Sequence, residues 1–345
     1  AMNLYELFMH STVLSRTAGS KTLRKRSGTK EREMRKMKIL VAEDDATSLF
    51  MLQSLLMKWG YDVIAASDGN EALSILQGDD PPLLAILDWM LPGESGPEIC
   101  RRLASRARLQ EGSDGGDEMG KPYQYIIILT VKGEKENVVA GLKAGADDYI
   151  TKPFDAHELQ MRVMVGKRIL DLQEQLRNAA LYDALTGLLN RRAVIERLEE
   201  EFHRTSRSGK PLNVALLDID HFKNINDTYG HASGDAVLVE CARRIKESVR
   251  PYDVTGRYGG EEFLLIFSDL EECRADDVCE RVRNAFQSAP FFPAEHDGER
   301  AEIEITVSIG ICEYSEGVEN VDALLAGADK ALYRAQEKGW NRVSR

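Results

Sequence analysis

Cysteine is scarce in this chain of 345 residues, and long apolar segments are missing. The five cysteines are scattered, odd in number and without a CxxC pair, which argues against a disulfide framework and against a zinc site. No run of roughly 18 apolar residues occurs, so no membrane span is predicted. The N-terminus also lacks the compact apolar core of a signal peptide. These absences predict a cytoplasmic protein with reduced thiols.

Charge is distributed unevenly along the chain. Residues 1–38 hold ten Lys/Arg and three Asp/Glu, a charge of +7, so the remainder must carry −19 to give the net charge of −12. A body this acidic argues against nucleic acid as the main partner, and no helix-turn-helix pattern indicates DNA binding. Residues 1–36 are predicted to be a disordered basic leader, with contact to nucleic acid or anionic lipid as the alternative. Ala1 before Met2 suggests a cloning remnant, and Met37 is an alternative start.

From residue 37 onward, short apolar strands alternate with helices. Helices are predicted at 47–59 and 70–76, and strands at 38–42, 62–65, 83–87, 125–129 and 146–150. Five apolar strands alternating with helices predict a parallel sheet covered on both faces, over residues 37–155. A Gly-rich polar stretch at 106–122 contains the letters GGDE, but no strands flank it, so it is expected to be a flexible surface loop.

A long helix is predicted to begin after Asp155. Its apolar residues recur at steps of four and three, as in a coiled coil. They are Met161, Val165, Ile169, Leu172, Leu176 and Ala179. Residues 156–180 are therefore predicted to be a dimerising connector; docking of the stripe on its own domain is the alternative.

Residues 181–345 are predicted to form a second domain with an α+β arrangement. A GlyGly turn within 253–267 indicates an antiparallel hairpin. Further strands are predicted at 213–219 and 302–314, with helices at 191–207, 234–248, 274–287 and 321–338.

Polar side chains follow the predicted strands of the first domain. Glu43, Asp44 and Asp45 follow the first strand, Asp88 the third, Thr130 the fourth and Lys152 the fifth. Ligands of open parallel sheets bind outside the carboxyl ends of the strands, so these side chains should converge. Clustered carboxylates repel one another unless a cation joins them, and Mg²⁺ prefers oxygen ligands. Asp88 would then be a nucleophile that carries a phosphoryl group held by Thr130 and Lys152; solvated strand ends are the alternative.

Residues 37–155 resemble the receiver domain of response regulators in four segments: VAEDD, LDWMLPG, ILT and TKPF. The resemblance implies a flavodoxin-like, five-stranded sheet and a cognate histidine kinase. It makes Asp88 the phospho-acceptor and places one Mg²⁺ among Glu43, Asp44 and Asp88. It also implies that Tyr149 is an aromatic switch residue that acts with Thr130 and Lys152.

A second group of acids lies in the α+β part. Asp218 and Asp220 end a buried strand, and Glu261 and Glu262 follow Gly259 and Gly260 in the hairpin. Glycines permit a tight turn, so these acids can face the neighbouring strand end. Carboxylates from two strands can hold the two cations of an in-line phosphoryl displacement. A charged hairpin alone would be weak evidence.

Residues 181–345 resemble the GGDEF diguanylate cyclase family. The matching segments are DALTGLLNRR at 183–192, DIDHFKNINDTYGH at 218–231, GD at 234–235, RYGGEEF at 257–263 and VSIG at 307–310. The resemblance implies a nucleotidyl-cyclase-like, mainly antiparallel fold. It also implies that two GTP molecules become cyclic di-GMP and pyrophosphate with two Mg²⁺ per site. Because each domain holds one GTP, the resemblance implies a homodimer.

The resemblance also assigns roles to residues. Asp218, the Ile219 carbonyl and Glu261 would bind metal, with Glu261 and Glu262 catalytic. The nucleotide site would comprise Phe222, Lys223, Asn226, Asp235 and Leu238. Asp235 favours guanine over adenine, because a carboxylate accepts from the N1–H and exocyclic amine of guanine. Arg250 and Asp253 match the RxxD site at which cyclic di-GMP inhibits, with Arg281 as a further contact.

The chain departs from the family near its C-terminus. Gln336 and Trp340 stand where the family has a phosphate-binding Lys and an Arg, and Lys338 is expected to compensate. The departure leaves open a second function, that of a catalytically weak domain that senses cyclic di-GMP through Arg250 and Asp253. His221 and His231 are expected to be structural.

Overall fold

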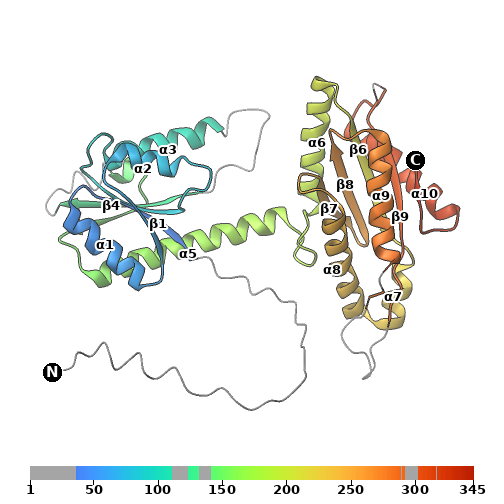
Figure 1. Cartoon of the computed structure of the whole chain (residues 1–345), viewed down its shortest axis with the longest axis horizontal. Coiled ribbons are helices and arrows are strands. Elements are labelled where there is room, and N and C mark those ends of the chain that lie inside the picture. Colours follow the sequence, from blue (N-terminus) through green and yellow to red (C-terminus); the bar gives the residue numbers. More distant parts are fainter. Residues whose placement is uncertain (1–35, 111–122, 132–140, 289, 292–301, 316) are drawn as a thin grey trace, which may run out of the picture. The chain divides into compact units, whose positions relative to one another are not determined.

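The computed structural model describes residues 36–110, 123–131, 141–288, 290–291, 302–315 and 317–345. The predicted leader, except for residue 36, and most of the predicted loop at 106–122 lie outside these residues. Two five-stranded sheets organise the described chain (Figure 1). Within the described part, no helix is both long and apolar enough to cross a membrane.

The first sheet has the strand order β2-β1-β3-β4-β5, and every neighbouring pair is parallel. Its strands are β1 (Lys38–Ala42), β2 (Asp62–Ala66), β3 (Leu84–Asp88), β4 (Tyr125–Val131) and β5 (Asp148–Lys152). This confirms the predicted flavodoxin-like sheet. β4 ends two residues later than predicted, and β5 both begins and ends two residues later, so Thr130 and Lys152 themselves lie in strand pairing.

Helices cover both faces of this sheet. α2 (Gly69–Leu76) and α3 (Gly96–Gln110) lie on one face, while α1 (Ala46–Lys58) and the first half of α5 (Ala156–Leu181) lie on the other (Figure 1). All five residues of β3 are buried, which explains why it reads as a continuous apolar run.

The long helix α5 begins at Ala156, where the Asp155 side chain accepts hydrogen bonds from the backbone N–H groups of His157 and Glu158. It docks on the first sheet through Leu159, Val163, Gly166 and Leu170, all buried. A Cβ at 166 would lie 2.6 Å from the Tyr125 ring, so glycine permits this approach. The docked face is not the predicted stripe, whose exposed members are Met161, Val165, Leu172, Leu176 and Ala179.

The second sheet has the order β10-β9-β6-β8-β7 and is antiparallel except between β9 and β10. Its strands are β6 (Leu212–Ile219), β7 (Val254–Gly259), β8 (Glu262–Ser268), β9 (Val307–Glu313) and β10 (Val343–Ser344). The mainly antiparallel sheet confirms the predicted class. The strand predicted at 302–314 is shorter, because residue 303 instead pairs with residue 291 in an isolated bridge.

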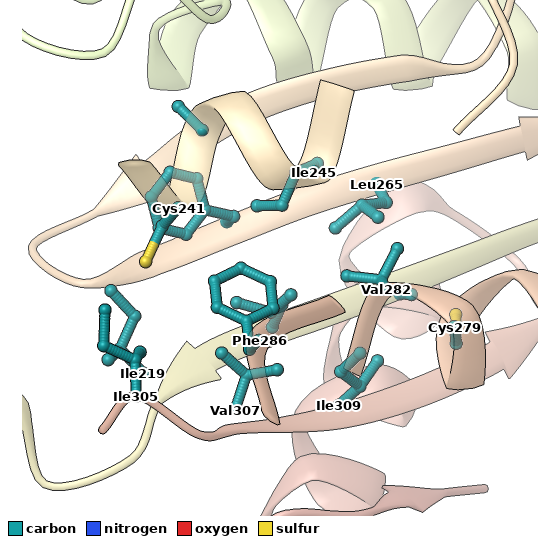
Figure 2. Packing of buried hydrophobic residues seen from close by; sticks show 14 of the residues in the cluster. Ile219, Cys241, Ile245, Leu265, Cys279, Val282, Phe286, Ile305, Val307 and Ile309 are labelled. Carbon is teal, nitrogen blue, oxygen red and sulfur yellow. The ribbon is translucent and has the colours of Figure 1, made fainter. Parts of the chain in front are cut away.

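Helices α8 (His231–Ser248) and α9 (Glu272–Gln287) pack on one face of the second sheet, around Phe286 (Figure 2). Helices α6 (Arg191–Ser208) and α10 (Val321–Glu337) pack on the other face. The short helix α7 (Phe222–Tyr229) follows β6 and was not predicted, since its two turns bury only Phe222 and Ile225. A Cβ at Gly310 on β9 would collide with the backbone of Leu332, so glycine lets α10 lie close to the sheet.

Candidate functional site

Three acids gather at the carboxyl edge of the first sheet. Ligand oxygens of Glu43, Asp44 and Asp88 all lie within 4.8 Å of one another, a donor set that fits Mg²⁺. Lys152 Nζ lies 2.6 Å from both Glu43 Oε2 and Asp88 Oδ1. Burial raises the pKa of Glu43 although the Lys152 hydrogen bond opposes this. The structure therefore brings together the residues predicted to surround a phosphoryl group.

Two of the three predicted switch residues, Thr130 and Tyr149, border a small crevice. Thr130 on β4 is buried, and its hydroxyl has no hydrogen-bond partner among the described residues. Tyr149 pairs with Ile128 on the next strand and lines the same crevice as Thr130 and Trp89. A buried hydroxyl without a partner is costly, so Thr130 is suited to donate to a group that arrives at Asp88.

Asp45, in contrast, belongs to the helix and not to the acid cluster. Its side chain accepts a hydrogen bond of 2.8 Å from the backbone N–H of Ser48 at the start of α1. This backbone hydrogen bond is the main reason why the pKa of Asp45 is lowered. Its role is that of a helix N-cap.

The second acid group lies where β6 and β8 end. Asp218 pairs directly with Glu262 across the two antiparallel strands. Glu261 and Gly260 form the turn that leads into β8, and Gly260 adopts a positive φ of 44°. The sequence prediction that acids from two neighbouring strands face one another is confirmed.

The proximity of these acids penalises their charges. Burial, followed by the charges of Glu261, Glu262 and Asp220, raises the pKa of Asp218 to about 7. Burial and the charge of Glu261 also raise the pKa of Glu262. A divalent cation would relieve this repulsion, so the donor set fits one. The acids are nevertheless less tightly gathered than in the first sheet: across the described residues, only the cluster at Asp88 places three side-chain ligand atoms within 4.8 Å.

Asp220 is held by the protein itself. Its carboxylate accepts hydrogen bonds from the Thr306 and Ser308 hydroxyls, both at 2.7 Å, and from the Asn341 backbone N–H at 3.0 Å. Because both oxygens are engaged, Asp220 fixes the end of β6 and the C-terminal segment together. Of the two acids at this strand end, Asp218 is thus the one whose carboxylate these three donors leave free to bind a cation.

The turn at Gly260 and Glu261 is held in place by Arg257 and Asp183, two residues to which the sequence analysis gave no role. The guanidinium of Arg257 donates to the Gly260 carbonyl at 2.8 and 3.0 Å and to the Asp183 carboxylate at 3.2 Å. Asp183 in turn accepts hydrogen bonds from the backbone N–H and hydroxyl of Thr186. Both residues occur in quoted motifs, but only the fold shows that they meet.

Predicted nucleotide-binding residues lie on α7 and α8. Asn226 and Phe222 border Gly234, where a Cβ would collide with the Asn226 side chain. Asp235 is exposed beside this contact, and Lys223 is exposed on α7. Phe222 and Leu238 are also members of the hydrophobic core, so their packing alone accounts for their residue type.

Helix α10 lies beside Asp218 and Glu262 and shares a cavity with them. A cavity of about 660 Å³ is lined by Asp218, Glu262 and Gln336, together with Asp329, Lys330, Leu332, Tyr333 and Arg334. Gln336 donates a hydrogen bond of 3.2 Å to Asp218. The Trp340 ring lies 4.7 Å from that of His221, centroid to centroid. Lys338 caps the end of α10, exposed.

The RxxD residues, Arg250 and Asp253, lie directly before β7 in the chain. The backbone N–H of Arg250 donates to Asp253 Oδ2 at 2.8 Å, whereas Asp253 Oδ1 is buried without a partner in the described chain. Burial raises the pKa of Asp253, and the charges of Arg250 and Arg281 oppose this. The structure therefore brings the three predicted residues together. It adds Tyr252, whose hydroxyl accepts from Arg250 at 3.2 Å.

Two family models match the chain: "Response regulator receiver domain" over residues 39–164 and "Diguanylate cyclase, GGDEF domain" over residues 180–342. Diguanylate cyclase A of Treponema denticola is 38% identical over 291 residues, which cover 83% of this chain and 73% of that protein. Response regulator PleD of Caulobacter vibrioides is 35% identical over 225 residues, 63% of this chain and 49% of PleD. The match therefore spans about half the length of PleD.

A solved structure is also similar. It is the coiled coil and GGDEF domain of DgcB from Caulobacter crescentus in complex with c-di-GMP. The TM-score is 0.50 and the identity 32%, over 55% of this chain and 97% of that one.

Proposed function

The chain belongs to the family of response regulators that join a receiver domain to a GGDEF domain, and from this we propose that it is a diguanylate cyclase controlled by phosphorylation of Asp88. The observation that carries the proposal is the pairing of Asp218 with Glu262 across β6 and β8, beside Glu261. Carboxylates so crowded are poised to hold cations beside a triphosphate.

Two GTP-loaded domains would face each other in a homodimer. In each, the ribose 3′-oxygen forms a bond to the α-phosphorus of the other GTP, while the bond from that phosphorus to the bridging oxygen of pyrophosphate breaks. Glu261 would take the proton from the 3′-hydroxyl. Asp218, Glu261 and the Ile219 carbonyl would hold Mg²⁺, which offsets the developing charge on the phosphate oxygens. Asn226 and Asp235 would read guanine, and Phe222, Leu238, Lys223 and Lys338 would complete the nucleotide site.

Control would begin with a phosphoryl group transferred to Asp88 by a cognate histidine kinase. Glu43, Asp44 and Asp88 would hold one Mg²⁺ there. Lys152, which contacts Glu43 and Asp88, would hold phosphoryl oxygens. The Thr130 hydroxyl, which has no hydrogen-bond partner in the described part of the chain, would donate to another of them. Movement of Thr130 toward the phosphoryl group would leave space at the crevice for the Tyr149 side chain. Rotation of Tyr149 into this space would transmit the effect of phosphorylation toward α5.

Product inhibition at Arg250, Asp253 and Arg281 is supported by Asp253 Oδ1, which is buried and finds no hydrogen-bond partner among the residues that the structure describes. A carboxylate oxygen of this kind can accept the N1–H and amine of guanine, while the arginines bind phosphate. The second candidate, a catalytically weak sensor of cyclic di-GMP, is favoured by one observation: the side chain that reaches Asp218 from α10 is the neutral amide of Gln336.

The decisive test incubates the full chain with GTP and Mg²⁺, with and without an acyl-phosphate donor such as acetyl phosphate. Wild type is expected to form cyclic di-GMP, faster with the donor. Asp88→Asn should retain only the slow rate, and Glu261→Gln should form no product. Binding of cyclic di-GMP without any synthesis would establish the sensor and refute the cyclase.

A further inference from the structure

Gln336 approaches the reaction site from α10, and its side chain is half-buried. Its Nε2 donates a hydrogen bond of 3.2 Å to Oδ1 of Asp218, and both residues line the same cavity. Glycine at 310 lets the backbone of α10 lie against β9. The helix, and with it the Gln336 amide, is therefore placed by backbone packing.

Asp218 and Asp220 are two residues apart but are held in different ways. Asp220 receives three hydrogen bonds, one each from the Thr306 and Ser308 hydroxyls and one from the C-terminal segment. Asp218 accepts its side-chain hydrogen bond from Gln336, whose amide is neutral. The hydrogen bond fixes one oxygen of Asp218 without bringing a positive charge to it.

The neutrality of this donor has a chemical consequence. An uncharged amide orients the carboxylate without forming an ion pair with it, so the charge of Asp218 stays available to a metal ion. Outer hydrogen bonds of this kind orient metal ligands, and their removal typically weakens metal binding by about 10- to 100-fold.

We infer that Gln336 is a positioning residue that orients Asp218 toward a divalent cation. The inference rests on the proposed function, since it concerns the same acid site. Gln336 would make no contact with the reacting atoms and would act only by orienting Asp218.

The test measures metal binding directly, in the full chain carrying Asp44→Asn to weaken the cation site of the first sheet. Mn²⁺ is titrated by electron paramagnetic resonance in the presence of 3′-deoxy-GTP, which lacks the attacking hydroxyl. Gln336→Met keeps the side-chain size and removes the donor. It is expected to raise the half-saturating Mn²⁺ concentration about tenfold. Affinity for 3′-deoxy-GTP at saturating Mn²⁺ should change less than about twofold, because no nucleotide contact is lost.

Lys330→Met is the matched control, because Lys330 lines the same cavity and is exposed. It should leave both constants unchanged. Unaltered Mn²⁺ binding in Gln336→Met would overturn the inference, as would an equal loss in Lys330→Met. A loss confined to nucleotide affinity would also overturn it and make Gln336 a nucleotide contact. Failure of wild type to make cyclic di-GMP, with Mn²⁺ still bound, would instead contradict the proposed function.

Discussion

At the scale of single residues, Asp218 shows how the crowded acids of the candidate site lower the stability of the folded chain. Its pKa is raised to about 7 by burial and by three neighbouring acids, whereas an aspartate in an unfolded chain titrates near 3.9. Between these values the folded state binds the extra proton. Stability from this group is therefore present below about pH 4, falls as the pH rises, and is lost above about pH 7.

Asp218→Asn should consequently stabilise the metal-free protein at pH 8. We expect a gain of about 1–2 kcal/mol, reduced from the full shift because the carboxyl is partly exposed to solvent. Calorimetric unfolding in EDTA at pH 8 and pH 5 would measure it, and the gain should shrink at pH 5. Asp227→Asn, at an exposed position of α7, serves as the control. No gain at pH 8 would mean that the acids do not repel one another as the geometry indicates.

Tyr252 permits a second prediction at this scale. Its side chain is 68% exposed, and its hydroxyl accepts from the Arg250 guanidinium. Tyr252→Phe removes one hydrogen bond, worth about 0.5–1 kcal/mol, and should raise the half-inhibitory cyclic di-GMP concentration about two- to fivefold. Initial rates without added product should not change. An unchanged inhibition constant would show that Arg250 needs no support from Tyr252.

The residues that sequence reasoning could assign are those whose position follows from strand ends and from the hairpin turn. Asp88, Lys152, Asp218 and Glu262 are of this kind. The structure pairs Asp88 with Lys152 in the first sheet and Asp218 with Glu262 in the second, as expected. The Gln336–Asp218 contact could not be foreseen as a hydrogen bond, because it joins residues 118 positions apart through the packing of a helix on a sheet.

At the scale of elements, the contact between α10 and β9 sets the shape of the cavity. Gly310→Ala would drive a methyl group into the backbone of Leu332 and Ala328, neither of which can move without displacing α10. The free energy of unfolding is expected to fall by about 3 kcal/mol, and synthesis at limiting Mg²⁺ is expected to fall as well, because Gln336 would leave Asp218. Thermal unfolding and product formation would measure the two effects. Gly317→Ala is the control, since a Cβ there meets nothing within 4 Å.

Most elements could be predicted because apolar periodicity is strong where one face is buried. α7 escaped notice because its two turns are too short for a helical period to show. The two-residue strand β10 escaped for a similar reason: it exists through pairing with β9 and has no apolar pattern of its own.

At the scale of the whole molecule, catalysis by the proposed route needs two copies of the chain. Helix α5 offers them an apolar stripe, with Leu172 49% and Leu176 71% exposed. The first half of α5 docks on the first sheet through a different face, so the residues of the stripe are not buried by this docking. Apolar side chains at coiled-coil spacing gain by burial against a second copy of the helix.

Leu172→Glu and Leu176→Glu are each expected to weaken the dimer by at least about tenfold, since a carboxylate would enter an apolar seam. Analytical ultracentrifugation measures the dissociation constant. Specific activity should fall in proportion at low protein concentration and recover at high concentration, because each assembled site remains intact. Lys167→Glu adds a carboxylate off the stripe and should leave both unchanged. Full activity of a strictly monomeric Leu176→Glu protein would show that the two GTP molecules are brought together without this helix.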